Sequence, residues 1–433
     1  MSQYSSVGIK VMDKAMKRKM SLYAGLLALS IIFIQTGISY YFSYQILALA
    51  LVGLIIFTSR PIFVNIKNQL IVLILLFLFI ITTALISPVV VSRNSSNIIG
   101  TVSGILTFAS IIMNLQHFIF LRVERVLWVL KYSTALVVII LSALLVLTDM
   151  NIIPGLNRQS LLLQNASLVT NFASDEMLNN ELAFRGIEES SPRVDLFYGE
   201  PSFLAIVFFT CGLSYILVLR LIQVKILIDQ GYPISSSLFL MTKFQKTVLS
   251  LAIFSLVYLL SLSSLIYSFI LIYAIIKDKS SIKKISLQSI LFFLIFSYLF
   301  INYGLDYLVL RSFTIDESLS FFQRFGSVFK FGLKEYLFGL HDLRMLPDEG
   351  LHNGMIYIIA ISGGAGIFYV YSILQTSIRL TRYLELSSVV VLSILALIMQ
   401  NGAVFSPNKV VLFALILLPL SCSRSIIKNV TIR

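Results

Sequence analysis

Two short segments of the sequence carry most of the residues suited to catalysis. In the first, Arg193 precedes a Gly-Glu-Pro-Ser run at residues 199–202, which leads directly into a long apolar stretch. Pro201 suits the first position of a helix because its missing N–H would have no partner there. Glu200 would then lie at the positive end of that helix, where a carboxylate can accept a proton or a hydrogen bond from a sugar hydroxyl. The simpler alternative is that Glu200 only adds a favourable charge to the helix end.

The second segment contains Arg324, Arg344 and His352, with Lys330 and Lys334 between the two arginines. His352 stands directly before another apolar stretch, where a helix dipole disfavours the protonated imidazole and leaves a neutral base. The alternative for this histidine is an ordinary cap or loop hydrogen bond. Both segments therefore pair fixed positive charge with one candidate base.

A metal site is a weaker interpretation of the second segment. Several of its side chains are of metal-binding types, but only Glu349 and His352 have the helical i, i+3 spacing. The sequence also has no P-loop, dinucleotide fingerprint or acid-x-acid motif of a nucleotide-sugar enzyme. We therefore expect neither a metal ion nor a cofactor. The residues considered as metal ligands are His341, Asp342, Asp348, Glu349 and His352.

The elements that must position these residues are long apolar stretches. Of the 433 residues, 58% are hydrophobic and 12% charged, a balance typical of polytopic membrane proteins and not of soluble enzymes. We predict an all-α polytopic membrane protein with about 12 transmembrane helices, in which residues 1–433 form a single integral membrane domain. The predicted spans lie near residues 20–36, 39–58, 69–90, 98–115, 132–148, 201–219, 246–261, 264–276, 287–305, 353–377, 386–401 and 409–422.

Charge predicts the orientation of these spans. With the N-terminus inside, the inner segments hold 23 of the 33 basic residues but only 5 of the 20 acidic residues. The positive-inside rule favours this orientation, with both termini cytoplasmic. The net charge of +13 then reflects membrane topology and anionic lipid, so we expect no nucleic-acid partner.

Two long connections, residues 149–200 and 306–352, would face the outside, and both segments described above lie in or next to them. Within the second connection, residues 317–338 predict an amphipathic surface helix, which either plugs the bundle or turns its basic face to a phosphate-bearing lipid. The predicted spans contain almost no ionisable residue, which disfavours a transporter. The apolar face of the surface helix would consist of Phe322, Phe325, Phe329, Leu333 and Tyr336.

Together these features resemble the bacterial O-antigen polymerases of the Wzy type, within the superfamily that includes the O-antigen ligases. The resemblance rests on the predicted topology and on short motifs: the arginine followed by Gly-Glu-Pro-Ser at 199–202, Arg324-Phe-Gly, Phe338-Gly, His352-Asn353 and Gly363-Gly. The Glu-Pro pair looks more like polymerases than ligases.

The resemblance implies a GT-C-like glycosyltransferase fold in the bacterial inner membrane, with two large periplasmic loops and an active site facing the periplasm. Its substrates would be undecaprenyl-diphosphate-linked oligosaccharides, as donor and as acceptor, and a chain-length regulator is a candidate partner. A lipid diphosphate leaving group needs charge neutralisation more than a general acid, and arginines can supply it without a metal. We expect Arg193 and Arg324 to contact the diphosphate, Arg344, Lys330 and Lys334 to assist in binding, and Glu200 or His352 to activate the acceptor hydroxyl.

Two alternatives stay open from the sequence. An O-antigen ligase would share these residues but transfer the polymer to a lipid A core. A polysaccharide flippase or another 12-span transporter would explain the apolar composition, although it should have charged residues inside the bundle and short outer loops.

Overall fold

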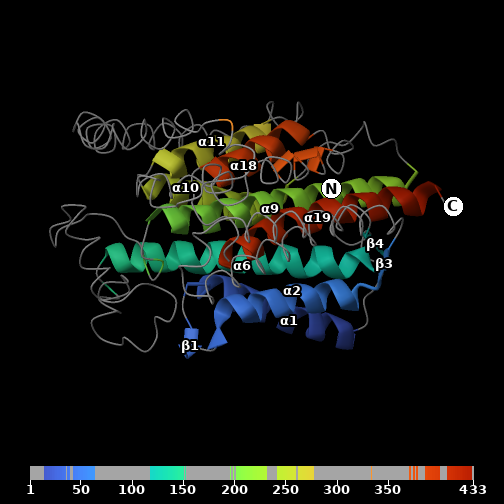
Figure 1. Cartoon of the computed structure of the whole chain (residues 1–433), viewed down its shortest axis with the longest axis horizontal. Helices are drawn as coiled ribbons and strands as arrows, with labels where there is room; N and C mark the ends of the chain where they lie inside the picture. The colour runs from blue at the N-terminus through green and yellow to red at the C-terminus, as the bar shows by residue number, and fades with distance from the viewer. Residues whose placement is uncertain are drawn as a thin grey trace. The chain divides into compact units, whose positions relative to one another are not determined.

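The computed structural model describes residues 14–63, 118–150, 201–231, 241–276, 386–399 and 407–431 without 36, 40, 41, 260 and 261, together with Ile152, Leu196, Tyr198, Leu333 and part of 370–378. In this part of the chain there are eight helices and four short strands (Figure 1). The helices are α1 (Lys14–Ile32), α2 (Tyr44–Thr58), α6 (Val123–Asp149), α9 (Pro201–Asp229), α10 (Lys243–Tyr258), α11 (Leu262–Ile276), α18 (Ser387–Met399) and α19 (Pro407–Thr431). The strands are β1 (Gly37–Ser39), β2 (Phe42–Ser43), β3 (Pro61–Phe63) and β4 (Phe118–Phe120).

Each of the eight described helices coincides with a span predicted from the sequence. Three stretches within them, Val123–Thr148, Phe203–Asp229 and Asn408–Ile426, are long and apolar enough to cross a membrane. The helices therefore support a membrane protein. The total of about 12 spans stays a prediction, because the remaining predicted spans lie wholly or mostly outside the described residues.

Three helices extend well beyond the apolar stretches that predicted them, and one of them is α19, which ends at Thr431 and not near residue 422. α6 begins at Val123, before the predicted start near residue 132, and α9 continues to Asp229, beyond the predicted end at 219. The reason is that a charged side chain does not end a helix, and 29 residues at about 1.5 Å each exceed the roughly 30 Å hydrocarbon core. Arg220, which the sequence placed in a connection, is consequently a buried residue inside α9.

The described residues are mostly helical, as predicted, with two short ribbons of strands that the sequence did not predict. β1 pairs with β2 and β3 pairs with β4, both antiparallel. The first ribbon occupies the beginning of the predicted span 39–58, so the helix itself starts only at Tyr44. Pairing of this kind satisfies backbone groups locally in the connections between apolar helices.

The chain divides into two compact units, of which the first comprises Met1–Ser59, Glu124–Leu219 and Met241–Leu271. Within it α1 and α2 lie side by side (Figure 1), and the Phe33 ring, just after α1, lies 5.5 Å from the Tyr44 ring at the start of α2. A hydrogen bond of 2.8 Å between the buried hydroxyls of Ser142 and Ser255 joins α6 to α10. In an apolar interior such a pair satisfies both hydroxyls and links the two helices.

A glycine allows α9 to approach α10 and α11 in the same unit. A Cβ atom at Gly212 would lie 3.0 Å from Cδ1 of Leu271 and 3.5 Å from Cβ of Ala252. Close by, the rings of Phe209 and Tyr267 stack with centroids 4.4 Å apart. Small residues at helix contacts and stacked aromatics are the usual means of tight packing between apolar helices.

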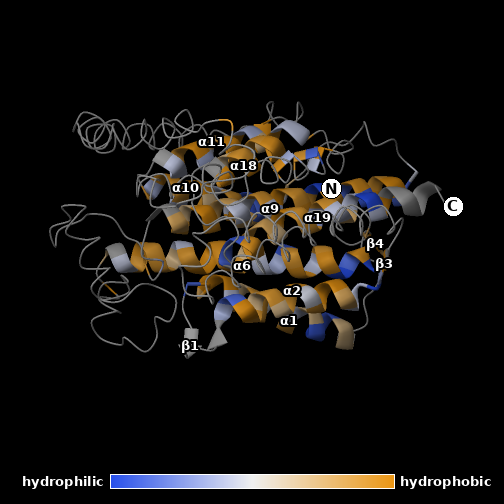
Figure 2. Cartoon of the chain, in the orientation of Figure 1, coloured by the Kyte–Doolittle hydropathy of each residue, from blue (hydrophilic) through white to orange (hydrophobic). Residues whose placement is uncertain are grey.

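Several hydroxyl groups inside the apolar helices bond to the backbone of their own helix. Ser30 donates to the Leu26 carbonyl at 2.7 Å, and Thr210 donates to the Ile206 carbonyl at 2.8 Å. Figure 2 shows hydrophobic residues along most of α2, α6 and α9, with few polar positions between them. These internal bonds let a hydroxyl lie in an apolar environment without an unsatisfied donor.

The second unit comprises Arg60–Val123, Arg220–Leu240 and Ile272–Arg433. In it β4 packs against α19, whose interior contains Pro419. Proline cannot donate a helix hydrogen bond, and Ser421 and Ser423 next to it donate to the carbonyls of Leu418 and Leu420 at 2.8 and 2.6 Å.

Candidate functional site at the start of α9

The start of α9 is the one part of the predicted site that the structure reaches. All seven residues predicted to act on the substrate lie outside the described residues. The structure describes the helix that follows Glu200, together with Leu196 and Tyr198 a few positions before it. The seven are Arg193, Glu200, Arg324, Lys330, Lys334, Arg344 and His352.

The prediction that Pro201 begins a helix is confirmed, since α9 runs from Pro201 to Asp229. Most of α9 is buried, as is expected for a helix that is apolar on all sides. Glu200 is bonded directly to its first residue. The structure therefore describes the helix that begins directly after the predicted base.

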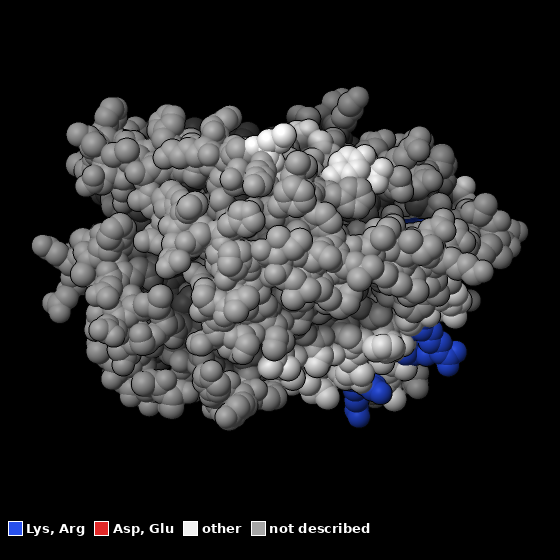
Figure 3. All heavy atoms as spheres, in the orientation of Figure 1, with Lys and Arg blue, Asp and Glu red and all other residues white. Residues whose placement is uncertain are grey.

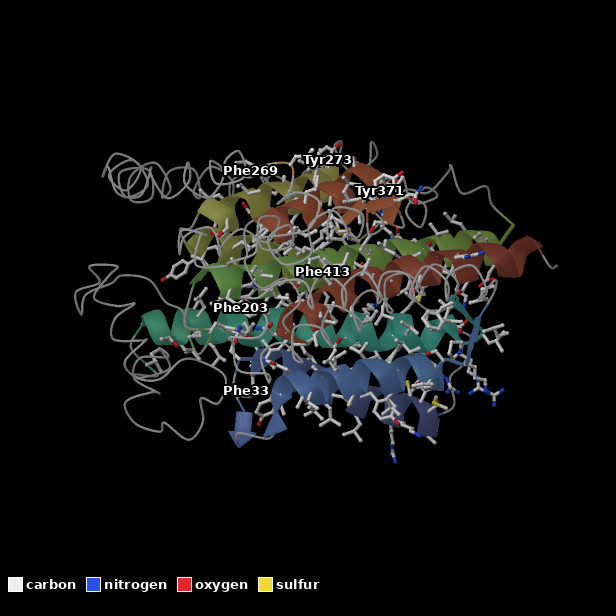
Figure 4. The ribbon with its side chains drawn as sticks, viewed as in Figure 1. Phe33, Phe203, Phe269, Tyr273, Tyr371 and Phe413 are labelled. Carbon is white, nitrogen blue, oxygen red and sulfur yellow. The ribbon has the colours of Figure 1, made fainter. Side chains whose placement is uncertain are left out.

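Tyr198 fastens the segment before α9 to the end of α1. Its hydroxyl donates a hydrogen bond of 3.2 Å to the Ile31 carbonyl, and the side chain is buried. Its ring stacks on that of Phe203 at a centroid distance of 5.9 Å, and Figure 4 shows Phe203 near the start of α9. Ile31 lies in the last turn of α1, and its carbonyl also accepts a hydrogen bond of 3.3 Å from the Ile34 amide. One tyrosine therefore links the last turn of α1 to the first turn of α9.

Leu196 is the second anchor of this segment. It is fully buried, and its backbone has a positive φ of 50°. Leucine seldom adopts this left-handed conformation, which is held only where the surrounding structure determines it. The buried side chain supplies that constraint at Leu196.

Burial raises the pKa of the Tyr198 hydroxyl well above its usual value, and the nearby Cys211 adds to the effect. A buried phenolate would be poorly solvated, so the neutral form is favoured. The hydroxyl therefore remains a hydrogen-bond donor at all physiological pH values. It is suited to holding the segment and not to accepting a proton from a substrate.

Sequence reasoning missed both Leu196 and Tyr198. Tyr198 stands immediately before the Gly-Glu-Pro-Ser run, so its place in the chain was known. Its partner is 167 residues away in the sequence, however, and a single sequence carries no signal for such a contact. The local apolar pattern indicated only that an aromatic residue precedes the helix.

Of the predicted surface helix and the predicted metal ligands, the structure describes a single residue, Leu333. Leu333, on the predicted apolar face of 317–338, is helical and 79% exposed. The remaining residues of that helix, and the five residues considered as metal ligands, lie outside the described part. Among the described residues there is no group of three or more His, Cys, Asp or Glu side chains that could hold a metal ion.

Comparisons of the chain with known protein families, with curated proteins and with solved structures found no match.

Proposed function

We propose that this protein is a membrane glycosyltransferase that polymerises a bacterial surface polysaccharide such as O-antigen. It transfers the growing glycan from undecaprenyl diphosphate to the terminal sugar of a new lipid-linked repeat unit. The observation that carries the proposal is the stretch from Arg193 to Pro201, in which an arginine and a glutamate lead into a buried helix whose start is fastened by Tyr198. Its Gly-Glu-Pro-Ser run resembles the corresponding motif of the Wzy-type polymerases, and this resemblance indicates which reaction we propose.

The chemistry of the reaction matches the residue types of the two segments. The acceptor hydroxyl attacks the anomeric carbon of the donor, the bond from that carbon to the diphosphate oxygen breaks, and the lipid diphosphate leaves. Arg193 and Arg324 neutralise the charge that develops on the diphosphate, through paired N–H donors. Arg344, Lys330 and Lys334 contribute further positive charge to the binding of the lipid-linked substrates.

Glu200 or His352 takes the proton from the acceptor hydroxyl. Of the two, Glu200 is the one with described neighbours in the chain, because it directly precedes α9 and follows Tyr198 by two positions. A base must be held within hydrogen-bond reach of the proton that it removes, so a fixed helix start next to it favours Glu200.

The proposed function implies a particular fold and a particular location in the cell. The chain forms about 12 spans of a GT-C-like fold in the bacterial inner membrane, with both termini in the cytoplasm. The loops at 149–200 and 306–352 form the active site on the periplasmic side, where lipid-linked repeat units would be joined.

The test is a gel of surface polysaccharide from a host that lacks the gene. A polymerase predicts that a single repeat unit remains attached to the lipid core, because export and ligation survive while chain growth stops. Complementation with the intact gene should restore the ladder of longer chains.

Two other results of the same gel would overturn the proposal. Loss of all surface sugar, with long polymer accumulating on the lipid carrier, would identify a ligase instead. Repeat units that remain unpolymerised inside the cell would identify a flippase.

A further inference from the structure

The ribbon of β3 and β4 is held firmly on one side within the second unit. Its register pairs Pro61 with Phe120 and Phe63 with Phe118. The Phe120 amide donates a hydrogen bond of 2.8 Å to the Ser425 hydroxyl of α19, and all three residues of β4 are buried. The ribbon therefore has a fixed position against α19.

The backbone positions of two arginines lie close together at one end of this ribbon. Arg60 immediately precedes β3, and Arg122 follows β4 by two positions. A backbone hydrogen bond of 3.3 Å from the Leu121 amide to the Arg60 carbonyl extends the pairing to this end. Residues that are far apart in the sequence are thus brought next to each other by the backbone alone.

Neither arginine forms an ion pair with any residue in the described part of the chain. Arg60 is exposed and Arg122 is half-buried. Apolar side chains are exposed beside them: 46% of Ile62 and 52% of Leu121. Among the described residues, the charged atoms visible on the face shown in Figure 3 are all basic.

The backbone of Arg60 adds an independent observation. Its φ is 51°, in the left-handed region that long side chains rarely occupy. Glycine would adopt this conformation without strain, as Gly231 does at a φ of 77°. A strained residue at a defined turn points to a use for its side chain, and here that side chain is a guanidinium that forms no ion pair with the residues that the structure describes.

We propose that the Arg60–Arg122 end of the ribbon binds the phosphate of an anionic phospholipid. Arg60 follows the apolar helix α2 by two positions, and Arg122 directly precedes the apolar helix α6. Both arginines would therefore lie at the membrane surface, where the lipid phosphates are. Arginine binds phosphate oxygens through paired N–H donors, while exposed aliphatic side chains such as Ile62 and Leu121 contact the acyl region. A soluble anion has no apolar part that could contact Ile62 and Leu121.

The experiment measures phospholipid retained by the purified full-length protein, using native mass spectrometry after exchange into nanodiscs of phosphatidylglycerol and phosphatidylethanolamine. Because the site requires the paired N–H donors of both arginines, Arg60→Gln with Arg122→Gln should lower retained phosphatidylglycerol about ten-fold or more. The matched control is Lys17→Gln with Arg18→Gln, which removes the same charge from exposed positions on α1. The control should retain phosphatidylglycerol as the wild type does.

A second variant separates lipid binding from folding. Arg60→Gly removes the strained φ, so its thermal midpoint in lipid-free detergent should equal or exceed that of the wild type. The rise in midpoint on adding phosphatidylglycerol should nevertheless be smaller than in the wild type. Unchanged lipid retention in the double variant would overturn the site, as would an equal loss in the α1 control, which would indicate general charge attraction.

Discussion

The hydroxyl of Tyr198 is the atom whose removal best tests the start of α9. Tyr198→Phe keeps the ring stacked on Phe203 but leaves the Ile31 carbonyl without this donor. We expect a loss of about 1 kcal/mol in the free energy of unfolding, together with reduced polymer synthesis. Thermal unfolding in detergent and a polysaccharide gel measure the two effects. If Glu200 is the base, kcat should fall more than KM rises.

Tyr215 provides the matched control for this change. It is also buried and lies in α9, but its hydroxyl has no hydrogen-bond partner in the part of the chain that the structure describes. Tyr215→Phe should therefore be neutral or slightly stabilising. An equal loss of activity in both variants would show that Tyr198 has no particular role in holding the segment.

The two arginines proposed to bind diphosphate are tested by truncation. Arg193→Ala or Arg324→Ala should lower polymer synthesis about a hundred-fold or more, because each removes charge neutralisation that the leaving group requires. Membrane abundance of the protein, measured by immunoblot, should not change. The conservative variants Arg193→Lys and Arg324→Lys should recover only part of the activity, since lysine lacks the paired donors. Wild-type activity in an alanine variant would remove that arginine from the mechanism.

At the scale of elements, Gly212 controls how closely α9 approaches α10 and α11. Gly212→Leu must displace both Leu271 and Ala252, so we expect a loss of about 1–3 kcal/mol in stability. Gly53→Ala in α2 is the control, because a Cβ there meets no atom within 4 Å. It should be neutral or raise stability by up to about 1 kcal/mol. Thermal unfolding in detergent compares the two, and equal destabilisation would contradict the packing argument.

The helices were predictable from the sequence because their signals are local. Apolar stretches marked all eight described helices, and Pro201 marked the start of α9. The start of α10 carries a comparable local signal, in which the Thr242 hydroxyl accepts from the Gln245 amide and the Gln245 side chain accepts from the Thr242 amide. Such patterns need only neighbouring residues.

The strands and the anchor of the candidate site were not predictable in this way. β3 and β4 have only three residues each and pair across a long stretch of sequence, so neither shows a period of its own. The contact between Tyr198 and Ile31 is of the same kind. The residue types and their spacing, by contrast, predicted two segments as the candidate site, and both the site and the roles of its residues remain predictions.

For the whole molecule, the proposed reaction makes a prediction about metals. Because arginines are expected to neutralise the diphosphate, addition of a chelator to membranes that synthesise polymer should leave the rate unchanged. The measurement is incorporation of labelled repeat units with and without EDTA. Loss of activity that one divalent ion restores would contradict the metal-free mechanism, and would direct attention to His341, Glu349 and His352.

The hydrogen bond between Tyr198 and Ile31 also affects how the protein is made. Its two partners are 167 residues apart, and translation at about 5–20 residues per second separates their synthesis by roughly 10–30 seconds. Ile31 is therefore synthesised well before the tyrosine that will bond to its carbonyl. The link between α1 and the start of α9 can form only after Tyr198 has left the ribosome, so it is a late contact in the folding of this unit.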